Sequence, residues 1–401
     1  MFTAFSVPNF RRYVAGQSLS LIGTWVETVA QALLVLRLTH SGTLLGLTTA
    51  ARYAPLLLLS PYAGLLVDRF PKRRVLLATQ FGLGLVSVVL GTSVLTGSVR
   101  LWQVIVLAVL FGMFSAVDNP ARQAFVQELV GHDLVRNAVT LNSTSVNVAR
   151  VIGPTIAAVL VSTVGIGWCF MANAASFGFV IASLLSLDTR ALHPSATVDR
   201  ARGQFRAGLR YAASRTSIIR PLLMMALIGT FAFEFEVSLP LLAEDTFRGS
   251  ETTYSWLLAA LGAGAVGGGL YTAYSGRTGV KRLTKTSVAF GIAVGLVAVA
   301  PTIATATAAC ALTGAASIIF LTTGNATIQI ASEPDYRGRV TALWSTALIG
   351  STAIGSPIIG ALSDAAGARY ALLLGTAACL CAAVIGARPV RAAASQAPTA
   401  Q

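Results

Sequence analysis

Five ionisable side chains stand inside long apolar stretches of this sequence, and they are the first candidates for chemistry. They are Glu27, Arg52, Arg150, Glu234 and Glu236. Only 11% of the residues are charged, whereas a soluble domain carries about 25%, so a charge within an apolar stretch needs an explanation. A carboxylate that is partly removed from water binds a proton more readily, and a nearby arginine can balance its charge. These residue types predict a proton-coupled site.

The sequence lacks the patterns of other kinds of site. Its three histidines fall in predicted loops, and its four cysteines fall within apolar runs without metal-ligand or disulfide spacing. There is no clustered Ser–His–Asp set, and no phosphate-binding glycine loop followed by Lys-Ser or Lys-Thr. The basic residues are spread over loops, which argues against nucleic-acid binding. We therefore expect no enzyme activity, no cofactor, no metal and no nucleic-acid partner.

The elements that must position the five side chains are membrane-spanning helices. The chain is 55% hydrophobic, with a mean hydropathy of +0.72. Apolar stretches recur that are long enough to cross a hydrocarbon core about 30 Å thick. Twelve spans are expected, at 14–37, 43–67, 75–96, 101–119, 138–163, 166–187, 220–243, 253–275, 284–301, 304–327, 340–362 and 368–387. The predicted fold class is an all-α membrane protein, and no cleavable signal is expected.

The longest polar stretch, 188–219, divides six spans from six. The predicted units are a six-helix bundle at 1–190, a central cytoplasmic loop at 191–219, a second six-helix bundle at 220–390 and a cytoplasmic tail at 391–401. Residues 136–141 resemble 338–343, and residues 153–158 resemble 355–360. Two parallel repeats of this kind are typical of secondary transporters, which place the substrate site between the halves.

Twelve spans put both termini on one side of the membrane, and the basic residues indicate which side. Of the 29 Lys and Arg, 23 fall on the face that holds the termini and four on the other. Because loops rich in Lys and Arg stay in the cytoplasm, both termini are expected to be cytoplasmic. The net charge of +14 is expected to favour contact with anionic lipid headgroups on that side. We expect a multi-pass protein of a bacterial cytoplasmic membrane that functions as a monomer.

The loop between the second and third spans, GLLVDRFPKRRVL, concentrates charge in an otherwise apolar region. Its residues Gly64, Asp68, Arg69, Arg73 and Arg74 resemble the signature loop of the major facilitator superfamily, although Pro71 departs from the usual glycine. The resemblance implies a cytoplasmic gate in which the acid accepts hydrogen bonds from the amino-terminal end of a facing helix. Asp118, near the end of the fourth span, is assigned to the same gate.

Three further stretches narrow the resemblance. VDNPARQAFVQELV (117–130), LNSTSVNVARVIGP (141–154) and SLPLLAEDTF (238–247) are similar to the branch of drug and siderophore exporters that includes enterobactin exporters and macrolide efflux permeases. Gly153 and Pro154 also resemble the antiporter signature of span five. Alanines replace its other glycines, so close helix packing is an equally good interpretation.

The resemblance implies that spans one, four, seven and ten line a cavity and that span five borders span one. With a rise of 1.5 Å per residue, the five charges lie about 20–24 Å along their spans, in one layer near the midplane. Glu27 and Arg150 could then meet, either as part of a proton-coupled site or as a structural ion pair, whereas Arg52 could reach the outer surface. Glu234 and Glu236 are about 200° apart around a helix and are not expected to face the same way.

The sequence therefore predicts a secondary active exporter of amphiphilic small molecules, such as drugs or siderophores. Proton antiport and alternating access would drive it. The alternative that stays open is a lipid or lysolipid flippase, or an uncoupled facilitator, of the same fold.

Overall fold

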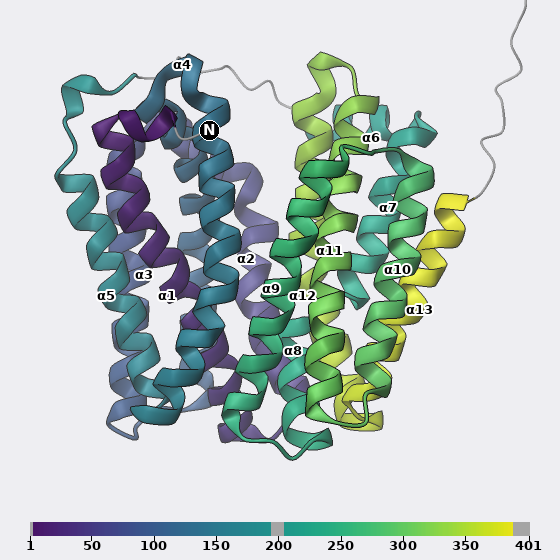
Figure 1. The fold of residues 1–401 in the computed structure, drawn as a ribbon. Helices are drawn as coiled ribbons and strands as arrows, with labels where there is room; N and C mark the ends of the chain where they lie inside the picture. Colours follow the sequence, from purple (N-terminus) through teal and green to yellow (C-terminus); the bar gives the residue numbers. More distant parts are fainter. Residues whose placement is uncertain (1–2, 194–203, 388–401) are drawn as a thin grey trace, which may run out of the picture.

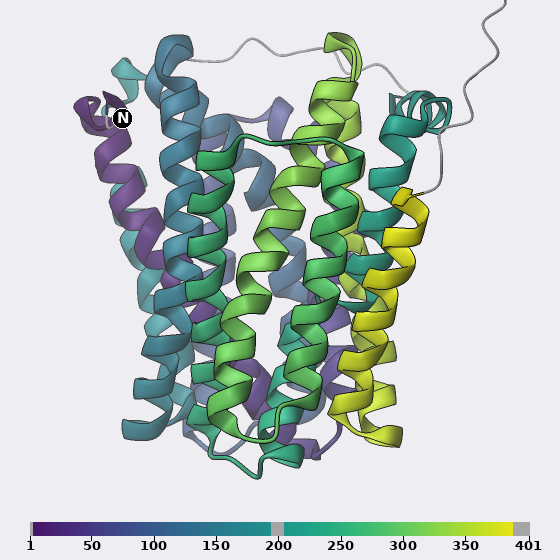
Figure 2. The ribbon, with the colours of Figure 1, turned by 45° about the vertical axis from the view of Figure 1, so that its right-hand side comes forward.

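The computed structural model describes residues 3–193 and 204–387, and in these ranges the regular structure is helical. Two groups of helices stand side by side, with the amino terminus and the end of the last helix on the same face (Figure 1). We call this face the terminal face and the other the opposite face. Figure 2 shows from a second angle that the long helices run between these two faces.

The first group, here called the first bundle, contains η1 (Thr3–Ser6), α1 (Pro8–Thr39), α2 (Gly42–Arg69), α3 (Lys72–Leu95), α4 (Leu101–Thr163), α5 (Ile166–Leu185) and η2 (Thr189–Ala191). The second bundle contains α6 (Gln204–Ala213), α7 (Thr216–Phe231), α8 (Phe235–Leu241), η3 (Leu242–Thr246), α9 (Glu251–Ser275), α10 (Val280–Val299), α11 (Ile303–Ala331), α12 (Pro334–Ala366) and α13 (Ala368–Ala387). Helix α6 lies within the predicted loop 191–219, and the predicted tail 391–401 lies outside the described residues.

The twelve predicted spans are confirmed, since twelve described stretches are long and apolar enough to cross a membrane. The segment 120–137 differs from the prediction of a loop. It is helical, so that α4 carries two spans, which meet at a kink where Gly131 has φ 69° and ψ 176°. Glycine adopts a positive φ of this kind at little cost in free energy, because it has no Cβ. The kink lets one continuous segment reverse direction at the terminal face.

The seventh span is not the single helix that its hydropathy predicts. Helix α7 ends at Phe231, a new helix α8 begins at Phe235, and a π-helical turn follows at Leu242–Thr246. Glu234 occupies the break with φ −82° and ψ 44°. Non-helical backbone at membrane depth is tolerated where it is buried in protein or lines a cavity, and transporters place binding sites at such breaks.

The two bundles meet chiefly where α2 packs on α12 and α4 packs on α9, and α8 also contacts α1 and α2. The approach is close because glycines stand at the contacts. A Cβ on Gly46 of α2 would overlap the carbonyl oxygen of Ser356 in α12, and a Cβ on Gly262 of α9 would lie 2.8 Å from the carbonyl oxygen of Arg150 in α4. Small residues of this kind let backbones pack directly in membranes.

At the opposite face, the Asp364 side chain of α12 closes on the first turn of α2. Its Oδ1 accepts a hydrogen bond from the Gly42 N–H at 2.5 Å. Its Oδ2 accepts from the Thr43 N–H at 2.9 Å, from the Thr43 hydroxyl at 2.7 Å and from the Ser41 hydroxyl at 2.8 Å. A carboxylate is favoured at a helix N-terminus by the unpaired N–H groups and the helix dipole. We call this contact the Asp364 latch.

Asp364→Asn should loosen this closure, because the amide keeps the shape of the side chain but loses the charge that strengthens the hydrogen bonds. The reporter is Thr49→Cys, a nearly isosteric change at a buried position of α2. In purified protein, maleimide should label this cysteine about five times faster when Asp364→Asn is added, as expected for a loss of about 1 kcal/mol.

The matched control is Asp133→Asn, the same chemical change at an exposed residue of the terminal face, which should leave the labelling rate unchanged. Equal rates with and without Asp364→Asn would show that the latch does not hold the bundles together.

Candidate functional site

A cavity of about 200 Å³ lies at mid-depth and extends toward the terminal face. Most of its wall comes from the first bundle. The lining residues are Gln17, Ser20, Leu21, Thr24, Trp25, Thr28, Arg52, Tyr53, Leu56, Gln80, Leu83, Phe111, Ser115, Asp118, Asn119, Arg122, Phe177 and Glu236. Glu236 is the residue of this set that belongs to the second bundle. The cavity therefore combines a mixed polar and aromatic wall with one carboxylate from across the bundle interface.

A smaller cavity of about 10 Å³ continues toward the opposite face. It is lined by Thr28, Gln31, Ala32, Leu45, Thr49, Arg52 and Glu236. Thr28, Arg52 and Glu236 line both cavities, so these three side chains form the partition between them. Any path from one face to the other through these spaces passes the partition.

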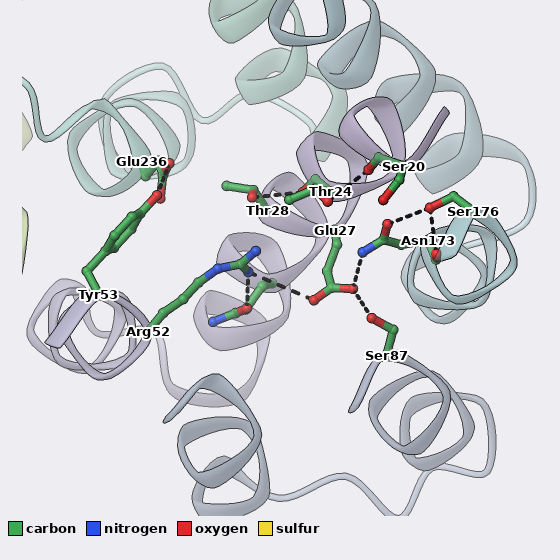
Figure 3. A network of polar contacts seen from close by, with 11 residues as sticks. Ser20, Thr24, Glu27, Thr28, Arg52, Tyr53, Ser87, Asn173, Ser176 and Glu236 are labelled. Carbon is green, nitrogen blue, oxygen red and sulfur yellow. Dashed lines mark hydrogen bonds and ion pairs between the residues drawn. The ribbon is translucent and has the colours of Figure 1, made fainter. Parts of the chain in front are cut away.

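Glu27 lies beside this partition but inside the first bundle. Its Oε2 accepts hydrogen bonds from the Ser87 hydroxyl at 2.5 Å and the Asn173 amide at 2.7 Å. Its Oε1 lies 3.9 Å from Nη1 of Arg52. Glu27 is 1% exposed and lines neither cavity. Figure 3 shows it enclosed by helices α1, α3 and α5, so it is a buried anion held by donors.

Arg52 is the cation of the partition. It is 7% exposed, so the expectation that it could reach the outer surface is wrong. Its Nη1 donates to Oε1 of Gln31 at 2.8 Å, and its guanidinium carbon lies 4.0 Å from the centre of the Phe111 ring. The hydrogen bond, the aromatic face and the nearby Glu27 together replace the water that a buried guanidinium loses.

Glu234 and Glu236 have different partners on the two sides of the helix break. Oε1 of Glu236 accepts a hydrogen bond from the Tyr53 hydroxyl of α2 at 3.0 Å, which joins the two bundles (Figure 3). Glu234 is buried, with 3% of its surface exposed. It accepts a hydrogen bond from the Ser356 hydroxyl of α12. Glu236 therefore faces the cavities, whereas Glu234 ties the break to its own bundle.

The predicted meeting of Glu27 and Arg150 is wrong, because the described cation beside Glu27 is Arg52. The guanidinium carbon of Arg150 instead lies 5.2 Å from the centre of the Trp25 ring. Residues 25 and 27 are about 200° apart around α1. Trp25 consequently faces α4, while Glu27 faces α3 and α5.

The loop that resembles the superfamily signature joins two described helices at the terminal face. Helix α2 ends at Arg69, and α3 begins at Lys72, directly after Pro71. The sequence predicted a helix boundary here because proline interrupts a helix. Gly64 is buried, Asp68 is half-buried, and Arg69 and Arg74 are exposed. Arg73 donates from Nε to the Leu184 carbonyl oxygen at 2.7 Å. This contact places a cation at the end of α5, where the helix dipole favours it.

Asp118 is a buried acid in α4 and is 3% exposed. Its Oδ1 accepts hydrogen bonds from the Thr79 hydroxyl and the Gln80 amide, both at 2.8 Å. Its Oδ2 lies 3.4 Å from Nε of Arg122. The acid therefore ties α3 to α4 at the terminal-face end of the cavity, and its role in a gate stays a prediction.

Gly153 and Pro154 lie within α4. A Cβ on Gly153 would overlap the Cβ of Trp25, so the glycine sets the distance between α4 and α1. This contact favours the packing interpretation of the pair.

Several residues of the site are missing from the sequence prediction. They are Gln31, Tyr53, Ser87, Phe111 and Asp364. Gln31 stands four residues after Glu27, so helical spacing from a charged residue was the available signal for it. Tyr53 follows Arg52 directly and had no such signal. Asp364 had a different signal, since an acid at the end of a span is suited to the N-terminus of a facing helix.

The comparisons with known proteins agree with this architecture. The model of the family described as "Transmembrane secretion effector" matches residues 1–400. The enterobactin exporter EntS of Shigella boydii is 25% identical over 358 residues, which cover 88% of this chain and 85% of that protein. The staphyloferrin A transporter of Staphylococcus aureus is 33% identical over 178 residues, 44% of each chain.

Solved structures show the same fold at low sequence identity. A bacterial homologue of the human lysosomal transporter Spinster, inward-facing and occupied, has a TM-score of 0.76 at 13% identity and covers 96% of each chain. The nucleoside transporter NupG has a TM-score of 0.71 at 12% identity and covers 94% of this chain and 98% of that one.

The resemblance found in the sequence is thereby confirmed, and so is the expectation of a transporter in place of an enzyme. Twelve spans, the broken seventh span and a family match over residues 1–400 lead to one assignment. This chain belongs to the transmembrane secretion effector family of major facilitator transporters.

Proposed function

We propose that the protein is a secondary active exporter of amphiphilic small molecules, with siderophores as the first class to test, and that it works by proton antiport and alternating access. One observation carries the proposal. Glu236 of the second bundle stands in the partition between two cavities and is bonded to Tyr53 of the first bundle. A carboxylate at this place can exchange a proton with either side as the bundles move.

The closed opposite face supports alternating access. The Asp364 latch and the direct contact of Gly46 with α12 lie on that side of the partition. The 200 Å³ cavity lies on the other side. A hollow on one side of the partition and a closure on the other is the arrangement from which rocking of one bundle against the other would expose the partition alternately.

The walls of the cavity support an amphiphilic cargo. Trp25, Tyr53, Phe111 and Phe177 offer aromatic faces, and hydroxyl and amide groups of α1 and α4 lie among them. The cavity is small beside the roughly 300–1,000 Å³ of ordinary ligand pockets. A siderophore would therefore bind as the bundles move apart. Two relatives are an enterobactin exporter and a staphyloferrin A transporter, and we extend the siderophore class to this chain.

Of the carboxylates that the sequence singles out, we assign the transported proton to Glu236. Glu27 has two donors and an ion pair, and it lines neither cavity. Glu234 is bonded to Ser356 within its own bundle. Glu236 lines both cavities, so movement of the bundles would expose its carboxylate to one side and then to the other.

Everted membrane vesicles with an acidified interior test the transport function. Adding enterobactin should raise the interior pH, reported by recovery of a quenched dye, because each cargo molecule that enters exchanges for protons. Glu236→Gln should reduce this response to the level of vesicles without the protein, since the amide cannot carry a proton. Glu27→Gln should keep a response, and Asp133→Asn, at an exposed acid of the terminal face, should keep it fully.

Several outcomes would contradict the proposal. A full response in Glu236→Gln that is lost in Glu27→Gln would move the coupling carboxylate to Glu27. Crossing of cargo or of labelled lipid without proton movement would favour the uncoupled facilitator or the flippase. If cationic dyes and macrolides move protons but enterobactin does not, the cargo class would be drugs.

The proposed direction of transport requires the terminal face to be cytoplasmic. Ser98 is exposed between α3 and α4 at the opposite face, and Asp133 is exposed at the terminal face. In intact cells, an impermeant maleimide should label Ser98→Cys and leave Asp133→Cys unlabelled until the membrane is permeabilised. The reverse pattern would invert the orientation. The background for both variants replaces Cys381, the exposed native cysteine, by serine.

A further inference from the structure

We propose that Arg52 is a positioning residue shared by two carboxylates, and that it transmits the charge of Glu236 across the bundle interface while Glu27 remains its fixed counter-ion. The proposal deepens the proposed function and rests on it for the identity of the moving proton. Arg52 belongs to the first bundle and Glu236 to the second, so any attraction between them acts directly on the motion of one bundle against the other.

The described contacts of Arg52 within the first bundle use few of its N–H donors. The 3.9 Å between its Nη1 and Oε1 of Glu27 is longer than a hydrogen bond, so the two groups form an ion pair without one. The hydrogen bond to Gln31 and the contact with Phe111 involve neutral groups. A guanidinium carries five N–H donors. Arg52 therefore keeps donors for an acceptor on its other side.

Glu236 is the acidic group on that other side. Both side chains line both cavities, and Figure 3 shows Arg52 between Glu27 and the Tyr53–Glu236 pair. An ionised Glu236 would be attracted to the guanidinium that lines the same two cavities, because charges are weakly screened where there is little water. Tyr53, the next residue on α2, already donates to Glu236. Neighbouring positions of one helix thus present a hydroxyl and a cation to one acid.

Glu27 is suited to the role of the fixed anion. The Ser87 hydroxyl and the Asn173 amide both donate hydrogen bonds to it, which fixes its position in the first bundle. It is 1% exposed, so solvent in the cavities does not contact it. Glu27 therefore balances Arg52 whenever Glu236 is neutral, which avoids the large cost of an unpaired buried charge.

Sharing of Arg52 between the two carboxylates would couple the proton on Glu236 to the binding of cargo. Ionised Glu236 attracts Arg52 across the interface and so favours the arrangement seen here, with the opposite face closed. Protonated Glu236 loses that attraction, and Arg52 remains with Glu27. A cargo with a carboxylate or another acceptor could also satisfy the free donors of Arg52. Either a proton on Glu236 or an acceptor-bearing cargo would then release the interface, which is the requirement for antiport.

Other charged and titratable groups face Glu236 and must be controlled for. Arg150 of α4 also interacts favourably with the ionised carboxylate, and Glu234 lies on the same chain segment. Tyr254 of α9 is 1% exposed and is coupled electrostatically to Glu236 and Tyr53. Arg150→Gln is the matched control, since it removes a second cation near Glu236 that has no described ion pair with Glu27.

Double electron–electron resonance between two spin labels at the terminal face tests the proposal without any cargo. The labels are placed on Asp133→Cys of the first bundle and Arg277→Cys of the second, both exposed positions, with Cys381 replaced by serine. The distance distribution is recorded in proteoliposomes between pH 5 and pH 8. High pH ionises Glu236 and should favour the long distance, whereas low pH protonates it and should favour the short one.

In the otherwise unchanged protein, the ratio of long to short distances should change by about fivefold or more over this range. Arg52→Gln and Glu236→Gln should each make the ratio independent of pH. Arg52→Lys should keep part of the response because it keeps the cation. Glu27→Gln and Arg150→Gln should keep a response, since Glu236 and Arg52 remain.

A pH response that persists in Arg52→Gln, disappears in Glu27→Gln, or is absent from the unchanged protein would overturn the proposal. Thermal unfolding of each variant identifies any that fails to fold, and for Arg52 the lysine variant then decides. Because no cargo is added, a failure of this test and a failure of enterobactin transport are separate results.

Discussion

A buried charge in a membrane protein must have a partner, and the architecture of this site follows from that constraint. Leaving one partner of a buried pair alone is strongly destabilising, and in the bilayer there is no water to replace it. Arg52 is surrounded by Gln31, Phe111 and Glu27, and Glu27 is surrounded by Ser87 and Asn173. These contacts fix the rotations of α1, α2, α3 and α5, so the first bundle is rigid where it faces the second.

The interface between the bundles is built differently. Much of it is backbone against backbone, as at Gly46, where little side-chain interdigitation opposes separation. The described polar contacts across it include the Asp364 latch, the pair of Tyr53 with Glu236, and the exposed pair of His40 with Glu244. Few polar contacts hold this interface, and its glycines have no side chains that interlock. Such an interface can have two arrangements of similar free energy. A change at one carboxylate can then decide between them.

The sequence predicted the spans well, because hydropathy depends on local composition alone. It failed where the outcome depends on rotation about a helix axis. Glu27 and Arg150 share a depth, yet Glu27 faces α3 and α5 while Arg150 lies against Trp25. The break at Glu234 was missed as well, since an apolar window gives the same hydropathy whether its helix is continuous or interrupted.

That break gives Glu236 a structural setting that differs from the setting of Glu27. Glu27 lies within a continuous helix, and its position is fixed by the packing of α1. Glu236 lies two residues beyond a backbone turn whose own acid, Glu234, is anchored to α12 through Ser356. The anchor keeps the turn in the second bundle, and the short helix α8 projects Glu236 toward the first. In the proposed mechanism, the charge of Glu236 is therefore carried by one bundle and sensed by the other.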